Sequence, residues 1–340
     1  MRWDAVNARA RGLATHLLDR GTLAGLAAAP DWPAFMARVM ALGYPLELVG
    51  GATVDPSSFD RAVSLVAVAR LNLLGRWLAS RQAVLAVVLE DEERRTLRAL
   101  LRGAAEGASP GARLRAVMPT PHLPIRALER LARASSVPDL MRELVRIGHP
   151  AGRAMQDVLR HAKVPDLRSL EWALTRLFSE RATRAARPGG SVVRRFAAEL
   201  VEQENVWTLL LSAPLDGGAL PDQDFLPGGA LLTREEFVRL RAERDSDRLM
   251  LGLRALFKGS ALGTVLAHDP LYMPSLEPRA AAARTAWLRR RARHDPLGPA
   301  VVLWVMERIR AEARALRAIG WGVAFGAPPP TIASLMPEAA

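Results

Sequence analysis

The residues that most often carry catalysis occur in this chain without the spacings that catalysis requires. A nucleotide-phosphate loop needs Gly-Lys-Ser or Gly-Lys-Thr, and neither of the two lysines, Lys163 and Lys258, follows a glycine. Gly320-Trp321-Gly322 with Gly326 resembles a dinucleotide loop, but that loop follows a β-strand, whereas this one follows an Ala- and Arg-rich helical pattern. We therefore interpret these glycines as a helix end and predict that the chain does not bind ATP.

Metal-binding chemistry has no support from the residue spacing either. Cysteine is absent, which excludes disulfides, thiol catalysis and cysteine-ligated zinc. No two histidines stand four residues apart, and none stands three residues after a glutamate, as metal sites on helices require. Asp222 and Asp224 could pair as carboxylates, but they lie in a Gly- and Pro-rich segment typical of a solvated loop. We expect no catalytic residue, no metal and no cofactor.

One candidate binding feature is a carboxylate on a predicted helix. The helix predicted over 191–212 carries an apolar stripe, in which Glu204 lies beside Asn205. A carboxylate on an apolar face needs a partner or water. Glu204 therefore either pairs with Arg194 or Arg195, of its own or an adjacent helix, or faces a polar cavity.

The second candidate feature is a basic run that ends at Asp295-Pro296. It comprises Arg284, Arg289, Arg290, Arg291 and Arg293. Such a run is usually the solvated face of a helix. It also suits lipid phosphate or an acidic protein surface, and the sequence leaves these interpretations open.

The composition predicts that helices position these residues. Half of the residues are apolar, which predicts an ordered core. The dominant types, Ala, Leu and Arg, are strong helix formers, so we predict an all-α fold. The net charge of +12 favours acidic partners or anionic lipid. The most apolar stretches, Val84–Leu89 and Leu297–Met306, are shorter than the ~20 residues that span a bilayer, so we expect a soluble chain.

One kind of segment recurs three times at a period near 110 residues. Residues 35–45, 140–150 and 249–259 each have the pattern of a short apolar helix ended by a glycine. His149 stands in the second copy where Tyr44 stands in the first. We therefore interpret His149 as a structural turn residue.

Two further kinds of segment follow each copy in the same order. The first is a serine before an apolar and an acidic residue, a helix-start signal because the hydroxyl can accept from free backbone amides; it occurs at Ser58, Ser169 and Ser275. The second begins with a glutamate, 109 and then 110 residues apart, at Glu93, Glu202 and Glu312. We predict three tandem helical units, with these glutamates in equivalent places, over residues 1–120, 121–225 and 226–340.

The same segments resemble the central-stalk C subunits of bacterial and archaeal V/A-type ATPases, the counterparts of the eukaryotic V-ATPase d subunit. Glu202-Gln203-Glu204-Asn205-Val206 is similar to that family's acidic–x–Glu–Asn–Leu core, with Thr96 and Ala315 in the place of Asn205 in the outer copies. The resemblance covers residues 4–332. Turns similar to those of the family lie at 43–45, 107–110, 148–150, 295–298 and 326–328.

This resemblance implies an architecture and a role. The three units would form a funnel around a pseudo-threefold axis, with one end on the membrane proteolipid ring and the other receiving the stalk subunits D and F. The chain would be a non-catalytic rotor subunit of a proton- or sodium-transporting rotary ATPase, peripheral on the cytoplasmic face of the cell membrane. The membrane stator subunit is a further candidate partner. The interface candidates are Glu93, Glu204, Asn205, Glu312, Arg289, Arg290 and Arg291.

Two other functions compete with this one. A pI of 11.3 would suit a helical nucleic-acid-binding protein. Arg is spread along nearly every predicted helix and interleaved with Glu and Asp, without aromatic platforms for bases, so we expect no nucleic acid as a partner. A generic helical scaffold would differ from the rotor subunit only in its partners.

Overall fold

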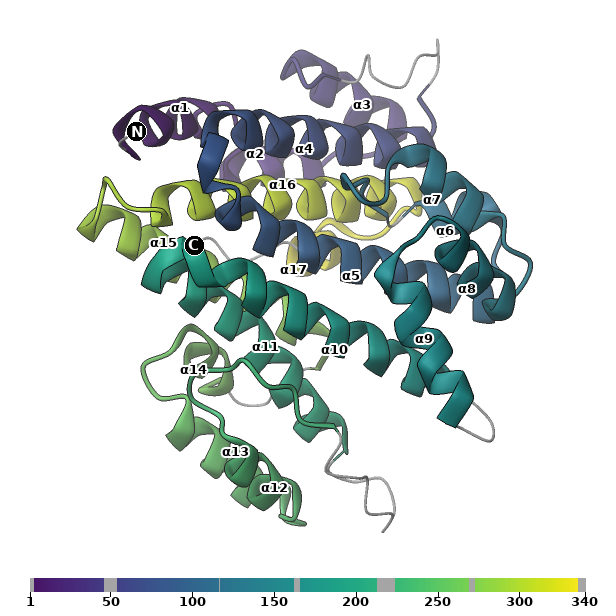
Figure 1. Cartoon of the computed structure of the whole chain (residues 1–340). Helices are drawn as coiled ribbons and strands as arrows, with labels where there is room; N and C mark the ends of the chain where they lie inside the picture. The colour runs from purple at the N-terminus through teal and green to yellow at the C-terminus, as the bar shows by residue number, and fades with distance from the viewer. Residues whose placement is uncertain are drawn as a thin grey trace.

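The chain folds into α-helices joined by turns, so the predicted all-α fold class is confirmed (Figure 1). The computed structural model describes residues 3–45, 54–115, 117–161, 166–212, 224–268 and 273–335, and no β-strand occurs within those ranges. The longest helices come in three consecutive pairs: α4 (Pro56–Leu78) with α5 (Ala83–Ala105), α10 (Leu167–Ala186) with α11 (Gly190–Ser212), and α15 (Met273–His294) with α16 (Ala300–Ala324).

A group of shorter helices precedes each pair. The first group is α1 (Trp3–Ala14), α2 (Arg20–Ala27) and α3 (Trp32–Ala41). The second is α6 (Pro110–Leu114), α7 (Ile125–Ala132), α8 (Val137–Arg146) and α9 (Pro150–His161). The third is α12 (Arg234–Arg241), α13 (Ser246–Leu256) and α14 (Ala261–Leu266), and α17 (Pro329–Leu335) follows the last pair. The order of a short group and a long pair thus occurs three times along the chain.

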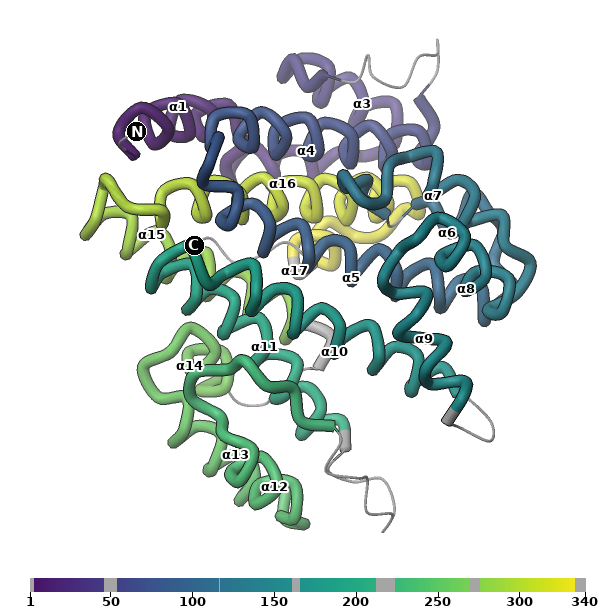
Figure 2. The backbone as a smooth tube through the Cα atoms, viewed as in Figure 1, coloured from purple at the N-terminus to yellow at the C-terminus, as the bar shows by residue number. Residues whose placement is uncertain are grey.

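The three groups of short helices lie at three different edges of the molecule, and the long helices cross its middle (Figure 1). The backbone tube of Figure 2 shows each long pair as a hairpin, and the three hairpin turns lie toward the same side as the N-terminus. The predicted unit boundaries and the funnel around a pseudo-threefold axis stay predictions.

The recurring short helices end where the sequence predicts. α3, α8 and α13 fall within or next to the three repeated segments. The glycines that follow them, Gly43, Gly148 and Gly259, have φ of 63°, 72° and 80°. This left-handed conformation favours glycine because it has no Cβ, so the punctuation seen in the sequence has a backbone cause.

The predicted helix starts are correct to within two residues, but the predicted cap was wrong. α4 and α10 begin two residues before Ser58 and Ser169. Their caps are Asp55 and Asp166, whose carboxylates accept from the backbone N–H of Ser58 and Ser169 at 2.7 Å. A carboxylate three residues upstream therefore takes the role that we assigned to the serine hydroxyl, because its charge also interacts favourably with the helix N-terminus.

The apolar core forms three main clusters, each containing one group of short helices. One cluster joins α6–α9 to the C-terminal half of α5, through residues such as Leu101, and to the start of α10, through Leu170. Another joins α12–α14 to the end of α11, through Leu209, and to the start of α15, through Leu276. Each of these short groups therefore packs between long helices that belong to two different pairs.

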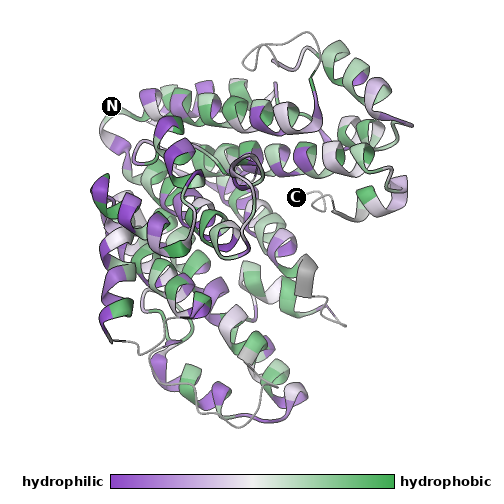
Figure 3. Ribbon diagram, turned by 90° about the vertical axis from the view of Figure 1, so that its right-hand side faces the viewer, coloured by the Kyte–Doolittle hydropathy of each residue, from purple (hydrophilic) through white to green (hydrophobic). Residues whose placement is uncertain are grey.

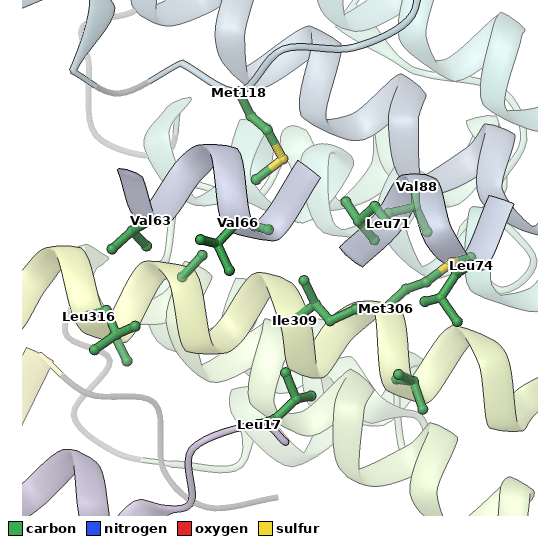
Figure 4. Packing of buried hydrophobic residues seen from close by; sticks show 14 of the residues in the cluster. Leu17, Val63, Val66, Leu71, Leu74, Val88, Met118, Met306, Ile309 and Leu316 are labelled. Atoms are coloured by element: carbon green, nitrogen blue, oxygen red, sulfur yellow. The ribbon is translucent and has the colours of Figure 1, made fainter. Parts of the chain in front are cut away.

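The largest cluster joins α1–α3 to α4 and α16. Val66 and Leu74 of α4 lie along α16, which presents Met306 and Ile309, and Leu17 lies on the other side of α16 (Figure 4). Apolar and polar segments alternate along the long helices, as expected of helices that bury one face (Figure 3). The first group of short helices is thus packed against the last long helix, as the other two groups are against earlier ones.

One stretch differs from the expectation that no segment is apolar enough to cross a membrane. By length and composition alone, Pro56–Arg81, which includes α4, passes that test. Half of its most apolar window is buried inside the protein, where it packs against α16. A core helix passes the same test, so the apolar composition of α4 is explained by its place between α1–α3 and α16.

The close approach of α16 to α4 gives a prediction for Gly320. A Cβ at Gly320 would lie 2.8 Å from the ring of Phe59, which is buried and held edge-on by Phe35 at 5.2 Å. Gly320→Ala should lower the free energy of unfolding by about 1–3 kcal/mol, because the ring has no room to move. Urea unfolding followed by circular dichroism measures this change.

Gly12 supplies the matched control. It lies in α1 with nothing within 4 Å of a Cβ. Gly12→Ala should therefore stabilise the protein by roughly 0.5–1 kcal/mol through helix propensity alone. Equal effects of the two substitutions would contradict the close packing at Gly320.

Candidate functional site

A buried ion-pair network lies where α5, α11, α15 and α16 meet. At its centre is Arg310 of α16, which is only 1% exposed. Its guanidinium donates to Asp91 and Glu92 of α5 and to Glu307, one turn earlier on α16. One side chain therefore holds two long helices from different pairs.

Arg284 of α15 extends the network to two more elements. Its guanidinium donates to Glu307 at 3.1 and 3.2 Å and to the side-chain oxygen of Gln203 on α11 at 3.1 Å. All three side chains are buried. Arg284 is thus an internal residue, and our assignment of it to the same basic run as Arg289–Arg293 was wrong.

Glu204 closes the network into a loop. It accepts from Arg94 at 2.9 Å and from Arg98 at 3.2 Å, and Arg94 also donates to Asp91 at 2.8 Å. The connections therefore run from α11 to α5, then to α16, to α15 and back to α11. Glu204 does pair with arginine, but its partners lie on α5.

The two arginines that we expected to pair with Glu204 have other partners. Arg195 pairs with Glu199, one turn along α11, at 2.8 Å. Arg194 donates to the backbone oxygen of Arg187 at 3.4 Å. The sequence correctly indicated that the carboxylate needs a cation, but it did not identify which helix supplies it.

The network is ionised at neutral pH. Burial alone would raise the pKa of Glu307, but the neighbouring Arg310 and Arg284 lower it to about 2. The pKa of Asp91 also lies well below its usual range, because Arg95, Arg310 and Arg94 outweigh its burial. Such a network contributes little net stability over an apolar core, but the loss of one member leaves buried charges without a partner.

Arg314 differs from the other arginines at this site. It lies one turn beyond Arg310, is half-buried, and has no hydrogen bond or ion pair with the described residues. Burial, together with the positive charge of Arg310, lowers its pKa to about 10. Arg314 therefore remains a cation at neutral pH, at the edge of a network whose carboxylates are already paired.

The three repeated glutamates make the same kind of contact. Each lies on the second helix of a long pair and binds the segment just before the next group of short helices. Glu93 accepts from the hydroxyl of Thr120, before α7, at 3.1 Å. Glu202 accepts from the backbone of Ala230, before α12, at 2.7 Å. Glu312 accepts from the backbone of Leu18, before α2, at 2.6 Å.

Two of these glutamates also meet residues that correspond in the repeat. The imidazole Nε2 of His149 lies 2.9 Å from Glu93. Tyr44 lies beside Glu312, and burial and the charge of Glu312 together raise the pKa of the Tyr44 hydroxyl. Both positions follow the glycine that ends a short helix, which supports the interpretation of His149 as a structural turn residue.

The charges around the three glutamates differ. Arg70 of α4 pairs with Glu312, and Arg181 of α10 lies 3.9 Å from Glu93. Glu202 has no ion pair with the described residues, and burial raises its pKa. One of its carboxylate oxygens also lacks a hydrogen-bond partner within the described part of the chain. The three contacts therefore share a geometry but not a charge balance.

Asn205 and Thr96 also have a common structural role. The side chain of Asn205 accepts from the backbone N–H of Leu226 and donates to its oxygen, both at 2.9 Å. The hydroxyl of Thr96 makes the same two bonds with Met118, at 3.2 and 3.4 Å. Ala315, at the third corresponding position, has no polar group for this purpose. Asn205 is fully buried, so its contacts are internal.

The remaining residues that we considered carry no chemistry. Asp224 pairs with Arg241 at 3.3 Å, and Asp222 lies outside the described residues. The segment 107–111 has the Gly-x-Ser-x-Gly spacing of a nucleophile elbow, which our reading of the sequence missed. Its serine, Ser109, accepts from the backbone of Ala112 and caps α6, and it follows a helix instead of the required strand. No group of acidic or imidazole side chains in the described ranges could hold a metal ion.

The exposed part of the basic run lies elsewhere. Arg289, Arg290 and Arg291 are exposed near the end of α15, away from the buried network. The interface candidates thus divide into buried groups with internal partners and an exposed basic surface.

A family comparison covers the whole of this arrangement. Residues 6–335 match the model of a family described as ATP synthase (C/AC39) subunit. The matched range includes the buried network, the three glutamates and the exposed arginines of α15. No curated protein is significantly similar to the chain.

The centre of the network gives a prediction for Arg310. Arg310→Met should lower the free energy of unfolding by about 3–5 kcal/mol, because three buried carboxylates lose their common cation. Arg310→Lys should lose less, since it keeps the charge but cannot reach all three groups at once. Arg290→Met, at an exposed site, should change stability by no more than about 0.5 kcal/mol. A similar loss at both positions in urea unfolding would argue against a structural role for the network.

The glutamates at positions 93 and 202 give opposite pH dependences. His149 and the other cations around Glu93 outweigh its burial and lower its pKa, so its contribution to stability is present above about pH 4.5 and is lost as pH falls. Burial raises the pKa of Glu202, so its ionisation costs stability as pH rises through the folded value.

Unfolding free energies of Glu93→Gln and Glu202→Gln, measured from pH 3.5 to 7, test this difference. As pH rises, wild type should gain stability relative to Glu93→Gln and lose stability relative to Glu202→Gln. Slopes of the same sign would show that the two sites do not differ in charge balance.

Proposed function

Because the chain belongs to the ATP synthase (C/AC39) subunit family, it is a subunit of a rotary ATPase, and we propose that it is the non-catalytic rotor subunit that couples the soluble ATPase sector to the membrane ring. The stalk subunits D and F and the proteolipid ring are its proposed partners, with the membrane stator subunit as a further neighbour. Its proposed location is peripheral, on the cytoplasmic face of the cell membrane. In this role it has no cofactor.

The observation that carries this proposal is the interlocking of the long pairs. A coupling subunit must pass torque between two non-covalent interfaces without deforming. Arg310 and Arg284 connect four long helices through buried ion pairs, and each short group packs on long helices of two pairs. A closely packed interior of this kind transmits strain with little deformation.

We propose different roles for the interface candidates. Glu204, at the network edge near Arg314, would steer the stalk through complementary charge. Glu93, Asn205 and Glu312 would act indirectly, by holding the segments before α7, α12 and α2 in place. The exposed Arg289–Arg291 surface would face the membrane sector.

The nucleic-acid alternative is weakened by the same contacts. Arg94, Arg98, Arg284 and Arg310 are committed to carboxylates of the chain itself. The high net charge therefore overstates the basic surface that is available for phosphate contacts.

Deletion of the subunit tests the coupling role. In inverted membrane vesicles, the ATPase sector should still hydrolyse ATP, while hydrolysis-driven ion pumping should be abolished. Re-expression of the wild-type chain should restore pumping, which controls for assembly of the other subunits. Full pumping in the deletion strain would rule out the proposed role, whatever the fold.

A further inference from the structure

The three hairpin turns of the long pairs meet at one end of the molecule, beside α1 (Figure 2). Val192, after the second turn, packs against Ala292, before the third. Asn7 of α1 donates to the backbone oxygens of Pro296 at 3.0 Å and Gly298 at 3.1 Å, in the third turn. The guanidinium of Arg81, in the first turn, lies 4.7 Å from the ring of Trp3. α1 therefore links the first and third turns.

This end carries most of the net charge of the chain. The segments 76–86, 184–195 and 289–300 contain ten arginines and a single acidic residue, Asp295. Nine of the twelve net positive charges thus lie around the three turns. We call this surface the basic end. Its exposed arginines are Arg76, Arg184, Arg187, Arg194, Arg289, Arg290, Arg291 and Arg293.

Apolar groups lie among these arginines. Leu297, at the tip of the third turn, is 60% exposed. Trp3 and Trp77 are half-buried beneath Arg81 and Arg9, whose guanidinium groups lie 4.7 and 5.9 Å from the rings. Exposed arginines, half-buried tryptophans and a protruding leucine are the combination found where proteins bind the headgroup layer of a bilayer.

We propose that the basic end binds an anionic lipid surface directly, with arginines of all three turns on the phosphates and Leu297 inserted among the headgroups. An acidic protein surface would account for the arginines, but not for an exposed leucine at their centre. The inference deepens the proposed function, because it supplies the membrane contact of a rotor subunit. It is tested on the isolated chain, so its failure is distinguishable from a failure of the coupling role.

Vesicle flotation measures the proposed contact. The full chain should bind phosphatidylcholine vesicles that contain phosphatidylglycerol, should not bind phosphatidylcholine alone, and should dissociate as salt screens the charges over about 8 Å at physiological ionic strength. Charge reversal of Arg289, Arg290 and Arg291 to Glu should weaken binding roughly a hundredfold or more. Leu297→Ser should weaken it roughly tenfold, because the apolar contact is lost.

A matched variant separates the surface from net charge. Reversal of Arg126, Arg133 and Arg239 to Glu changes the total charge equally at exposed arginines outside the basic end and should leave binding nearly unchanged. Circular dichroism checks that all variants are folded. Equal loss of binding in both triple variants, binding to neutral vesicles, or capture by immobilised polyglutamate without any vesicle binding would each overturn the proposal.

Discussion

The burial of one guanidinium constrains the position of every long pair. Removing a charged group from water costs several kcal/mol, and the cost is offset only if carboxylates surround it in good geometry. For Arg310 these carboxylates come from its own helix and from α5, more than 200 residues earlier in the chain. Glu307 then shares its charge with Arg284, which reaches Gln203 of α11. A shift of any one of the four helices would leave a buried charge unpaired, so the network restricts their relative positions far more than apolar packing alone would.

A second set of contacts is repeated around the molecule. Glu93, Glu202 and Glu312 each bind the segment that leads into the next short group, and the last of them binds the first group, before α2. Thr96 and Asn205 add a two-bond contact with the same segments at two of the three places. The tandem units are therefore connected by contacts between neighbours as well as by the chain. This connection explains why the short groups share their cores with long helices of two pairs.

Local features of this fold could be predicted from the sequence, whereas the network could not. The ends of α3 and α8 follow from glycines in a left-handed conformation, a property of single residues. The caps of α4 and α10 needed only a longer view upstream, to Asp55 and Asp166. In contrast, Arg284 and Arg289 lie on one helix and have the same side chain, yet one is buried and the other exposed. What separates them is Glu307 on the facing helix, and no local pattern in the sequence reveals that partner.

The unequal charge around the three glutamates implies that the molecule is not equally stiff in all directions. Two of the joints include a cation beside the carboxylate, from Arg70 and Arg181. The joint at Glu202 has none within the described residues and places an ionised group in an apolar setting. Under torque, the α12–α14 lobe should therefore yield before the other two. A rotor with one compliant lobe stores elastic energy at that lobe, and can smooth the mismatch between the discrete steps of a catalytic head and those of an ion-carrying ring.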